Sequence, residues 1–160
     1  MGETAKPEPR RVTVDRQAFQ NWLDRYVEAW KTYDEQKIND LFSEDVLYKY
    51  SPQDDGLKGR EEVVKSWLDD KDDPGTYDAK YEVLAIDGDT HVANGWSRYF
   101  TAPGGELRDE YFNVYVCKFD GDGRCREFIE YWIQNRDFRR RDREDLIRET
   151  REGAAAPAVA

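Results

Sequence analysis

The chain of 160 residues suits a single domain, large enough to bury a core without disulfide staples. Its 35 acidic and 25 basic residues leave a formal net charge of −10, which argues against nucleic acid as a partner, because binding to phosphates depends on Lys and Arg. Five Trp, ten Tyr and seven Phe supply the apolar area that a disordered chain of such high charge would lack, so we expect a folded protein.

The sequence pattern predicts neither a membrane span nor a secretory signal. No apolar run approaches the ~20 residues of a spanning helix, and residues 1–4 lead into charges rather than into an apolar signal core. Cys117 and Cys125 flank one turn and, counted by alternation, fall on opposite faces, so we expect two reduced, unbridged thiols. These features predict a cytoplasmic protein without a membrane partner.

Three helices are expected ahead of the main sheet. Apolar residues recur at three-four spacing from Asp15, a suitable N-cap, to Tyr33. A short second helix follows and runs through Phe42, and residues 43–45 close it before a strand at 46–50. A third helix at 59–70 ends in an acidic loop.

The second half of the chain alternates with period two, which is typical of strands. Turn residues separate four such runs, at 77–86, 91–101, 107–119 and 125–134. This order predicts a four-stranded antiparallel meander. Helices that precede long antiparallel strands favour an α+β domain, in which the helices pack on one concave sheet.

The last two strands carry polar and aromatic residues on the face expected to point inward. These residues are Tyr111, Asn113, Tyr115 and Cys117 on one strand, and Phe128, Glu130 and Trp132 on the other. Hydroxyl, amide and carboxylate groups in place of Val, Leu and Ile indicate a ligand cavity. Aromatic surroundings should raise the pKa of Glu130, which suits a general acid or base. The alternative is a glutamate bound structurally, or one turned to solvent by a register slip.

Several tyrosines could aim hydroxyls at a carbonyl or enolate, as an oxyanion site requires: Tyr26, Tyr50, Tyr99, Tyr111 and Tyr115. The alternative for each is a place in an aromatic core with its hydroxyl reaching water or backbone. His91, the single histidine, is expected at the surface. One His and two separated Cys predict no metal site, and no glycine-rich phosphate loop follows a strand, so we expect no cofactor.

Short motifs occur in a characteristic order along the chain. Tyr26 lies between Arg and Val in the first helix, Leu41-Phe42 precedes Asp45 and the first strand, and Asp122-Gly123-Arg124 precedes a last strand with Glu130-Tyr131-Trp132. From about residue 19 to 135 the chain resembles the SnoaL-like branch of the nuclear transport factor two-like superfamily. The resemblance implies a cone-shaped α+β domain, a curved antiparallel sheet with three N-terminal helices closing a pocket.

The resemblance also bears on the site. Relative to the steroid isomerase branch, Tyr26 falls on the oxyanion-donating tyrosine, Tyr50 on the general-base aspartate, and Tyr115 near the second acid. Relative to the limonene epoxide hydrolase branch, Glu130 falls on the water-activating aspartate, whereas its supporting arginine and second aspartate fall on uncharged positions, Gly95 and Ser97. The full set of catalytic residues of neither branch is therefore present in this chain.

The sequence therefore predicts a flexible segment at 1–14, the SnoaL-like domain at 15–136, and a charged extension at 137–160 that is solvated or serves as an interface. We expect a hydrophobic small-molecule ligand, with Glu130, Tyr26 and Tyr115 as catalytic candidates. The candidate ligand contacts are Trp22, Tyr50, Trp67, Tyr99, Tyr111, Asn113, Phe128 and Trp132. A ligand-binding domain without turnover and a dimerisation module with a filled pocket remain alternatives.

An apolar stripe on the outer sheet face indicates a homodimer, because a monomer would expose it to water. Its members alternate with the inward-facing residues: Phe112, Val114, Val116, Ile129, Tyr131 and Ile133. Many relatives implied by the resemblance pair through this face.

Overall fold

The computed structural model describes residues 13–135, and its first element is the long amphipathic helix α1 (Arg16–Thr32). Asp15 caps it as expected, because its Oδ1 accepts a hydrogen bond from the backbone N–H of Ala18 at 2.8 Å. The helix ends at Tyr33, which takes the left-handed conformation with φ of 48°. No helix among the described residues is both long and apolar enough to cross a membrane.

Two shorter helices and two strands follow. Helix α2 (Glu35–Leu41) leads directly into β1 (Phe42–Lys49), and β2 (Leu57–Lys58) precedes α3 (Arg60–Asp69). Strand β1 therefore begins four residues before the predicted strand at 46–50. The reason is tertiary, since Phe42 pairs with Cys125 of the last strand and extends β1 back across an irregular register.

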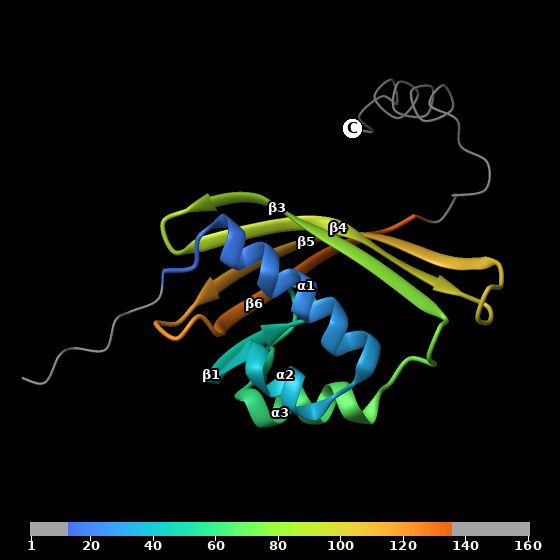
Figure 1. The fold of residues 1–160 in the computed structure, drawn as a ribbon, viewed down its shortest axis with the longest axis horizontal. Helices are drawn as coiled ribbons and strands as arrows, with labels where there is room; N and C mark the ends of the chain where they lie inside the picture. The colour runs from blue at the N-terminus through green and yellow to red at the C-terminus, as the bar shows by residue number, and fades with distance from the viewer. Residues whose placement is uncertain (1–12, 136–160) are drawn as a thin grey trace, which may run out of the picture.

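The predicted meander is confirmed in strands β3 (Tyr77–Asp87), β4 (Thr90–Phe100), β5 (Leu107–Phe119) and β6 (Cys125–Gln134). Each of these strands pairs antiparallel with the next. Within residues 13–135 the sheet has six strands in the order β2-β1-β6-β5-β4-β3, with β1 parallel to β6. The three helices of the described part of the chain lie on one side of this curved sheet (Figure 1), which confirms the α+β fold with three helices ahead of the meander.

The core lies between the helices and the sheet and is unusually aromatic. The Phe128 ring stacks on Tyr48, with centroids 4.5 Å apart, and on Tyr26 at 5.5 Å. Trp22 is buried beside them, and its indole N–H donates to the carbonyl of Leu41 at 3.0 Å. Large rings contribute much apolar area each, which is how a chain with 38% charged residues builds its core.

His91 is buried, so the expectation of a surface residue is wrong. Its Nε2 lies 2.6 Å from the carbonyl oxygen of Val14, and its ring packs edge-on against Phe19 and Phe119. The start of α1 covers the beginning of β4, a long-range contact that the position of His91 beside a turn does not reveal.

The two cysteines are buried and unbridged, but they do not lie on opposite faces. A register shift after Lys118 pairs Phe119 with Cys125, which brings Cys125 to the inner face. Burial and a hydrogen bond with the Cys125 thiol raise the pKa of Cys117. Simple alternation failed here because the turn is followed by a bulge.

Candidate functional site

A cavity of about 410 Å³ opens between α1, α3 and the inner face of the sheet. Its walls combine many aromatic rings with a few polar groups, as ligand pockets commonly do. The lining comprises nine aromatic residues, two serines and three acids: Tyr26, Trp30, Tyr33, Tyr48, Tyr50, Trp67, Tyr81, Tyr99, Tyr115, Ser66, Ser97, Asp70, Asp72 and Glu130.

Glu130 is half-buried on β6, opposite Tyr115 of β5. The Nδ2 of Asn113 donates to Glu130 Oε1 at 2.6 Å, and Ser97 Oγ donates to Asn113 Oδ1 at 3.2 Å. This chain of bonds fixes the carboxylate from behind. Within residues 13–135, Glu130 Oε2 accepts no hydrogen bond. Every fully buried side-chain oxygen in this range has a hydrogen-bond partner, so Oε2 is not fully buried. Oε2 is therefore open to the cavity.

Burial raises the pKa of Glu130 from its ordinary value of 4.5 to about 7, against the opposing effect of the Asn113 hydrogen bond. The shift predicted from the aromatic neighbours is confirmed in direction. Near neutral pH the carboxyl group can therefore both take up and release a proton, which is the property that general acid–base catalysis needs.

Tyrosine hydroxyls surround the carboxylate. Tyr26 OH and Tyr48 OH share a hydrogen bond of 2.8 Å, and Tyr50 OH bonds Ser66 Oγ at 2.9 Å. Burial holds the pKa of Tyr26, Tyr48 and Tyr115 well above the usual tyrosine value. These phenols stay protonated at neutral pH, so they can donate hydrogen bonds to a ligand oxygen but cannot act as bases.

The rim of the cavity is fixed by Asp72, which follows α3. Its Oδ2 accepts hydrogen bonds from Trp30 Nε1 at 3.0 Å and from Tyr33 OH at 3.1 Å. The backbone N–H of Asp72 donates back to Tyr33 OH at 2.9 Å. These bonds tie the loop after α3 to the end of α1, so the rim and the α1 wall are held together.

Six of the eleven residues expected at the site line the cavity, namely Tyr26, Tyr50, Trp67, Tyr99, Tyr115 and Glu130. Trp22 and Phe128 lie deeper in the core, and Asn113 supports Glu130 from behind. Tyr111 packs edge-on against Trp132, which is 49% exposed. By alternation Trp132 shares the face of Glu130, but it lines a second hollow and not this cavity.

Other lining residues were not expected from the sequence: Trp30, Tyr33, Tyr48, Ser66, Asp70, Asp72, Tyr81 and Ser97. Trp30 and Tyr33 follow Tyr26 by four and seven positions, so helical periodicity placed them on the same face. Asp72 carries no such signal, because it reaches the cavity from a loop that the packing of α1 positions.

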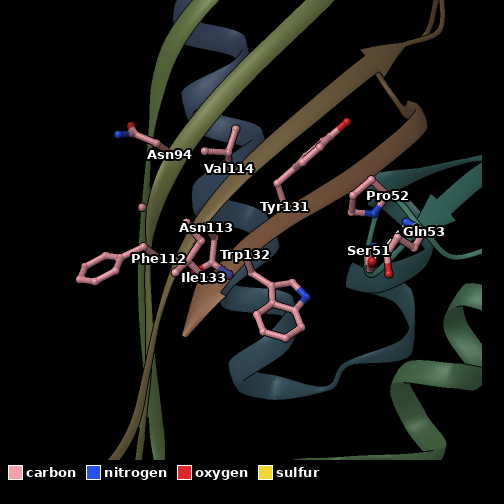
Figure 2. A pocket seen from close by; sticks show the side chains of 11 residues that line it. Ser51, Pro52, Gln53, Asn94, Phe112, Asn113, Val114, Tyr131, Trp132 and Ile133 are labelled. Atoms are coloured by element: carbon pink, nitrogen blue, oxygen red, sulfur yellow. Dashed lines mark hydrogen bonds between the residues drawn. The ribbon is translucent and has the colours of Figure 1, made fainter. Parts of the chain in front are cut away.

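A second hollow, of about 590 Å³, lies on the opposite face of the sheet. Figure 2 shows side chains of β4, β5 and β6 on one side of it and Ser51, Pro52 and Gln53 on the other. Phe112 is 50% exposed, Tyr131 46% and Ile133 73%. The outer apolar stripe predicted from alternation is thus present and open to solvent in the single chain.

Residues 23–145 match the model of the SnoaL-like domain family. The chain belongs to this family. Among solved structures, this SnoaL-like protein is similar to an LEH-like epoxide hydrolase from M. tuberculosis, with a TM-score of 0.56 and 14% identity over 87% of this chain and 93% of that one. It is also similar to a candidate ketosteroid isomerase from Kribbella flavida, with a TM-score of 0.58 and 18% identity over 82% and 89% of the two chains. No curated protein sequence matches it.

Family membership confirms the resemblance, and the two structural likenesses support the cone-shaped fold alone at these identities. Apart from Glu130, the positions that the resemblance aligned with charged residues hold neutral groups within the SnoaL-like domain. Tyr50 bonds Ser66 at the cavity wall, and Ser97 supports Asn113. Asn113 and Ser97 therefore orient Glu130 without a charged partner.

Because the pKa of Glu130 is raised, we expect the free energy of unfolding to depend on pH. Because the folded state holds this proton more tightly than the unfolded chain, the contribution of Glu130 to stability is highest below pH 4.5 and is lost as pH rises through about 7. The loss is at most about 3 kcal/mol. Glu130→Gln keeps an acceptor for Asn113 and removes the titration, so its urea unfolding free energy should fall less between pH 5 and 8 than that of the native chain or Glu127→Gln. An unchanged pH dependence would contradict the shift.

Proposed function

We propose that this SnoaL-like domain binds a small molecule with a large apolar part and acts on it by cofactor-free proton transfer through Glu130. One observation carries the proposal: a carboxylate with a pKa of about 7 is held by Asn113 and presents Oε2 to an aromatic cavity. A structural glutamate would instead have both oxygens bonded inside the protein.

The proposed chemistry uses few groups. As a base, Glu130 takes a proton from a carbon next to a carbonyl, or from a water molecule, and later returns it as an acid. Tyr26 and Tyr115 line the same cavity and stay protonated, so they can donate to the oxygen that gains negative charge. Tyr50 takes no part as a base, because burial raises its pKa above the usual range.

A binding domain without turnover is the second candidate. It is favoured by the absence of a cationic side chain from the described lining of the cavity, since an arginine would orient the carboxylate and stabilise developing anions. In that case Glu130 and the tyrosines recognise a ligand, and the raised pKa serves affinity alone.

A thermal-shift screen tests both candidates. Ketosteroids, epoxides, terpenoids and polyketide-like aromatics are the probes, and each compound that raises the Tm is then assayed for turnover. A ligand stabilises the protein only if it prefers the folded state. Proton transfer predicts binding to the native chain and to Glu130→Gln, with turnover by the native chain alone. Binding without turnover supports the second candidate, and no binding at all points to a dimerisation module.

We further propose a homodimer through the outer sheet face, because the exposed Phe112, Tyr131 and Ile133 continue the apolar wall of the outer hollow. Val114→Glu places a charge in the middle of this face and is expected to give a monomer in light scattering after gel filtration. Leu84→Glu, an equally drastic change at exposed Leu84 of the far strand β3, should remain a dimer. A native chain that elutes as a monomer would contradict the proposal.

A further inference from the structure

The lining of the cavity that contains Glu130 is acidic. Asp70 and Asp72 lie at its rim and Glu130 at its sheet wall, and no cationic side chain of residues 13–135 lines it. None of the three acids forms an ion pair with another described residue. In the same part of the chain, no three or more His, Cys, Asp and Glu side chains gather closely enough to hold a metal ion.

The aromatic walls have the complementary property, because ring faces attract cations. Two aromatic rings of the lining already contact cationic side chains of the same chain at the rim of the cavity. Lys71 Nζ lies 5.7 Å from the ring centroid of Tyr33, and Arg108 Cζ lies 5.8 Å from that of Tyr99. Arg108 also pairs with Asp109 at 2.7 Å and is not among the residues that line the cavity.

We infer that the ligand of this cavity is a small organic cation, with an ammonium or quaternary ammonium group joined to an apolar body. This deepens the function proposed above and rests on it, since it assumes that the cavity binds a small molecule. The open Oε2 of Glu130 supplies a counter-charge, and the surrounding rings solvate the ammonium group. A neutral ligand would displace water from the carboxylate and favour its protonated form, whereas a cation pairs with the ionised form.

The affinity for a cation should depend on the charge of Glu130, because the other groups that face Glu130 stay neutral. Six tyrosines face it and stay neutral, because burial raises the pKa of each: Tyr26 of α1, Tyr48 of β1, Tyr50 just after β1, Tyr81 of β3, Tyr99 of β4 and Tyr115 of β5. Asn113 carries no charge. Cation affinity should therefore rise with pH through about 7, the pKa of Glu130, whereas the affinity of a neutral ligand should not rise.

The test compares phenyltrimethylammonium with tert-butylbenzene, which has the same shape without the charge, by calorimetry with the full chain at pH 5.5 and 8. We expect the cation to bind at least about tenfold tighter than its isostere at pH 8. Glu130→Gln and Asp72→Asn should each weaken cation binding and leave the isostere unaffected. Both replacements keep hydrogen-bond acceptors. Glu82→Gln, at exposed Glu82 of β3, is the matched control and should bind like the native chain.

The outcomes separate this inference from the proposed function. Equal or tighter binding of tert-butylbenzene overturns the cation inference, and turnover of a neutral compound would then leave proton transfer standing. Selective cation binding that is lost in Glu130→Gln supports the inference even if no compound is turned over. Binding of neither probe overturns the cation inference, whereas the proposed proton transfer fails only if the screen of neutral compounds also gives no turnover.

Discussion

Glu130→Gln is expected to lower the ring opening of 5-nitrobenzisoxazole by about 10²- to 10⁴-fold, the usual contribution of a positioned general base. This reaction needs only a base that removes the ring C–H proton while the N–O bond breaks, so it reports on the carboxylate without knowledge of the natural substrate. Glutamine keeps the acceptor that Asn113 Nδ2 uses at 2.6 Å, and the change therefore removes the base and preserves the local structure.

The pH dependence of the same reaction identifies the base. The native rate should rise with pH and reach half its plateau near 7, where Glu130 ionises. Glu127→Gln removes a carboxylate from the outer face of the same strand, beside Lys118, and should retain the native rate and profile. Equal rates in the native chain and in Glu130→Gln would contradict the proposed chemistry. A native rate no faster than the rate with acetate at the same concentration would also contradict it.

Gly95→Ala is expected to destabilise the fold by about 3 kcal/mol or more, near the upper end for an overpacked site. Gly95 lies on β4 beside Tyr81 of β3, and a Cβ there would come within 1.9 Å of the Lys80 carbonyl oxygen and 2.6 Å of the Tyr81 ring. A backbone oxygen cannot rotate away as a side chain can, so the two strands would have to separate.

Urea unfolding measures this loss, and Gly88→Ala is the matched control. Gly88 has a positive φ of 59°, and a methyl group added there would meet no other atom within 4 Å, so its replacement should cost only about 1 kcal/mol of backbone strain. A smaller loss at Gly95 than at Gly88 would contradict the close approach of β3 and β4. The same contact leaves no room for a long side chain at Gly95, the position that the resemblance aligned with an arginine of the limonene epoxide hydrolase branch.

Much of the fold was determined by local pattern. The three-four spacing after Asp15 specified α1 and its inward face, and period-two alternation specified four strands with short turns. The faces of β5 and β6 followed as well, which placed Tyr115 and Glu130 together on the inner side of the sheet. Regular elements are predictable in this way because their side-chain directions depend only on residue count.

The tertiary structure alone decided the features that depend on long-range packing. The parallel pairing of β1 with β6 extended β1 to Phe42, and a bulge moved Cys125 to the inner face. The rim residue Asp72 reached the cavity from a loop, held by Trp30 and Tyr33. The sequence determined by itself that Glu130 faces an aromatic interior. Only the fold decided which atoms support it and which oxygen stays open, because those contacts join residues that are distant along the chain.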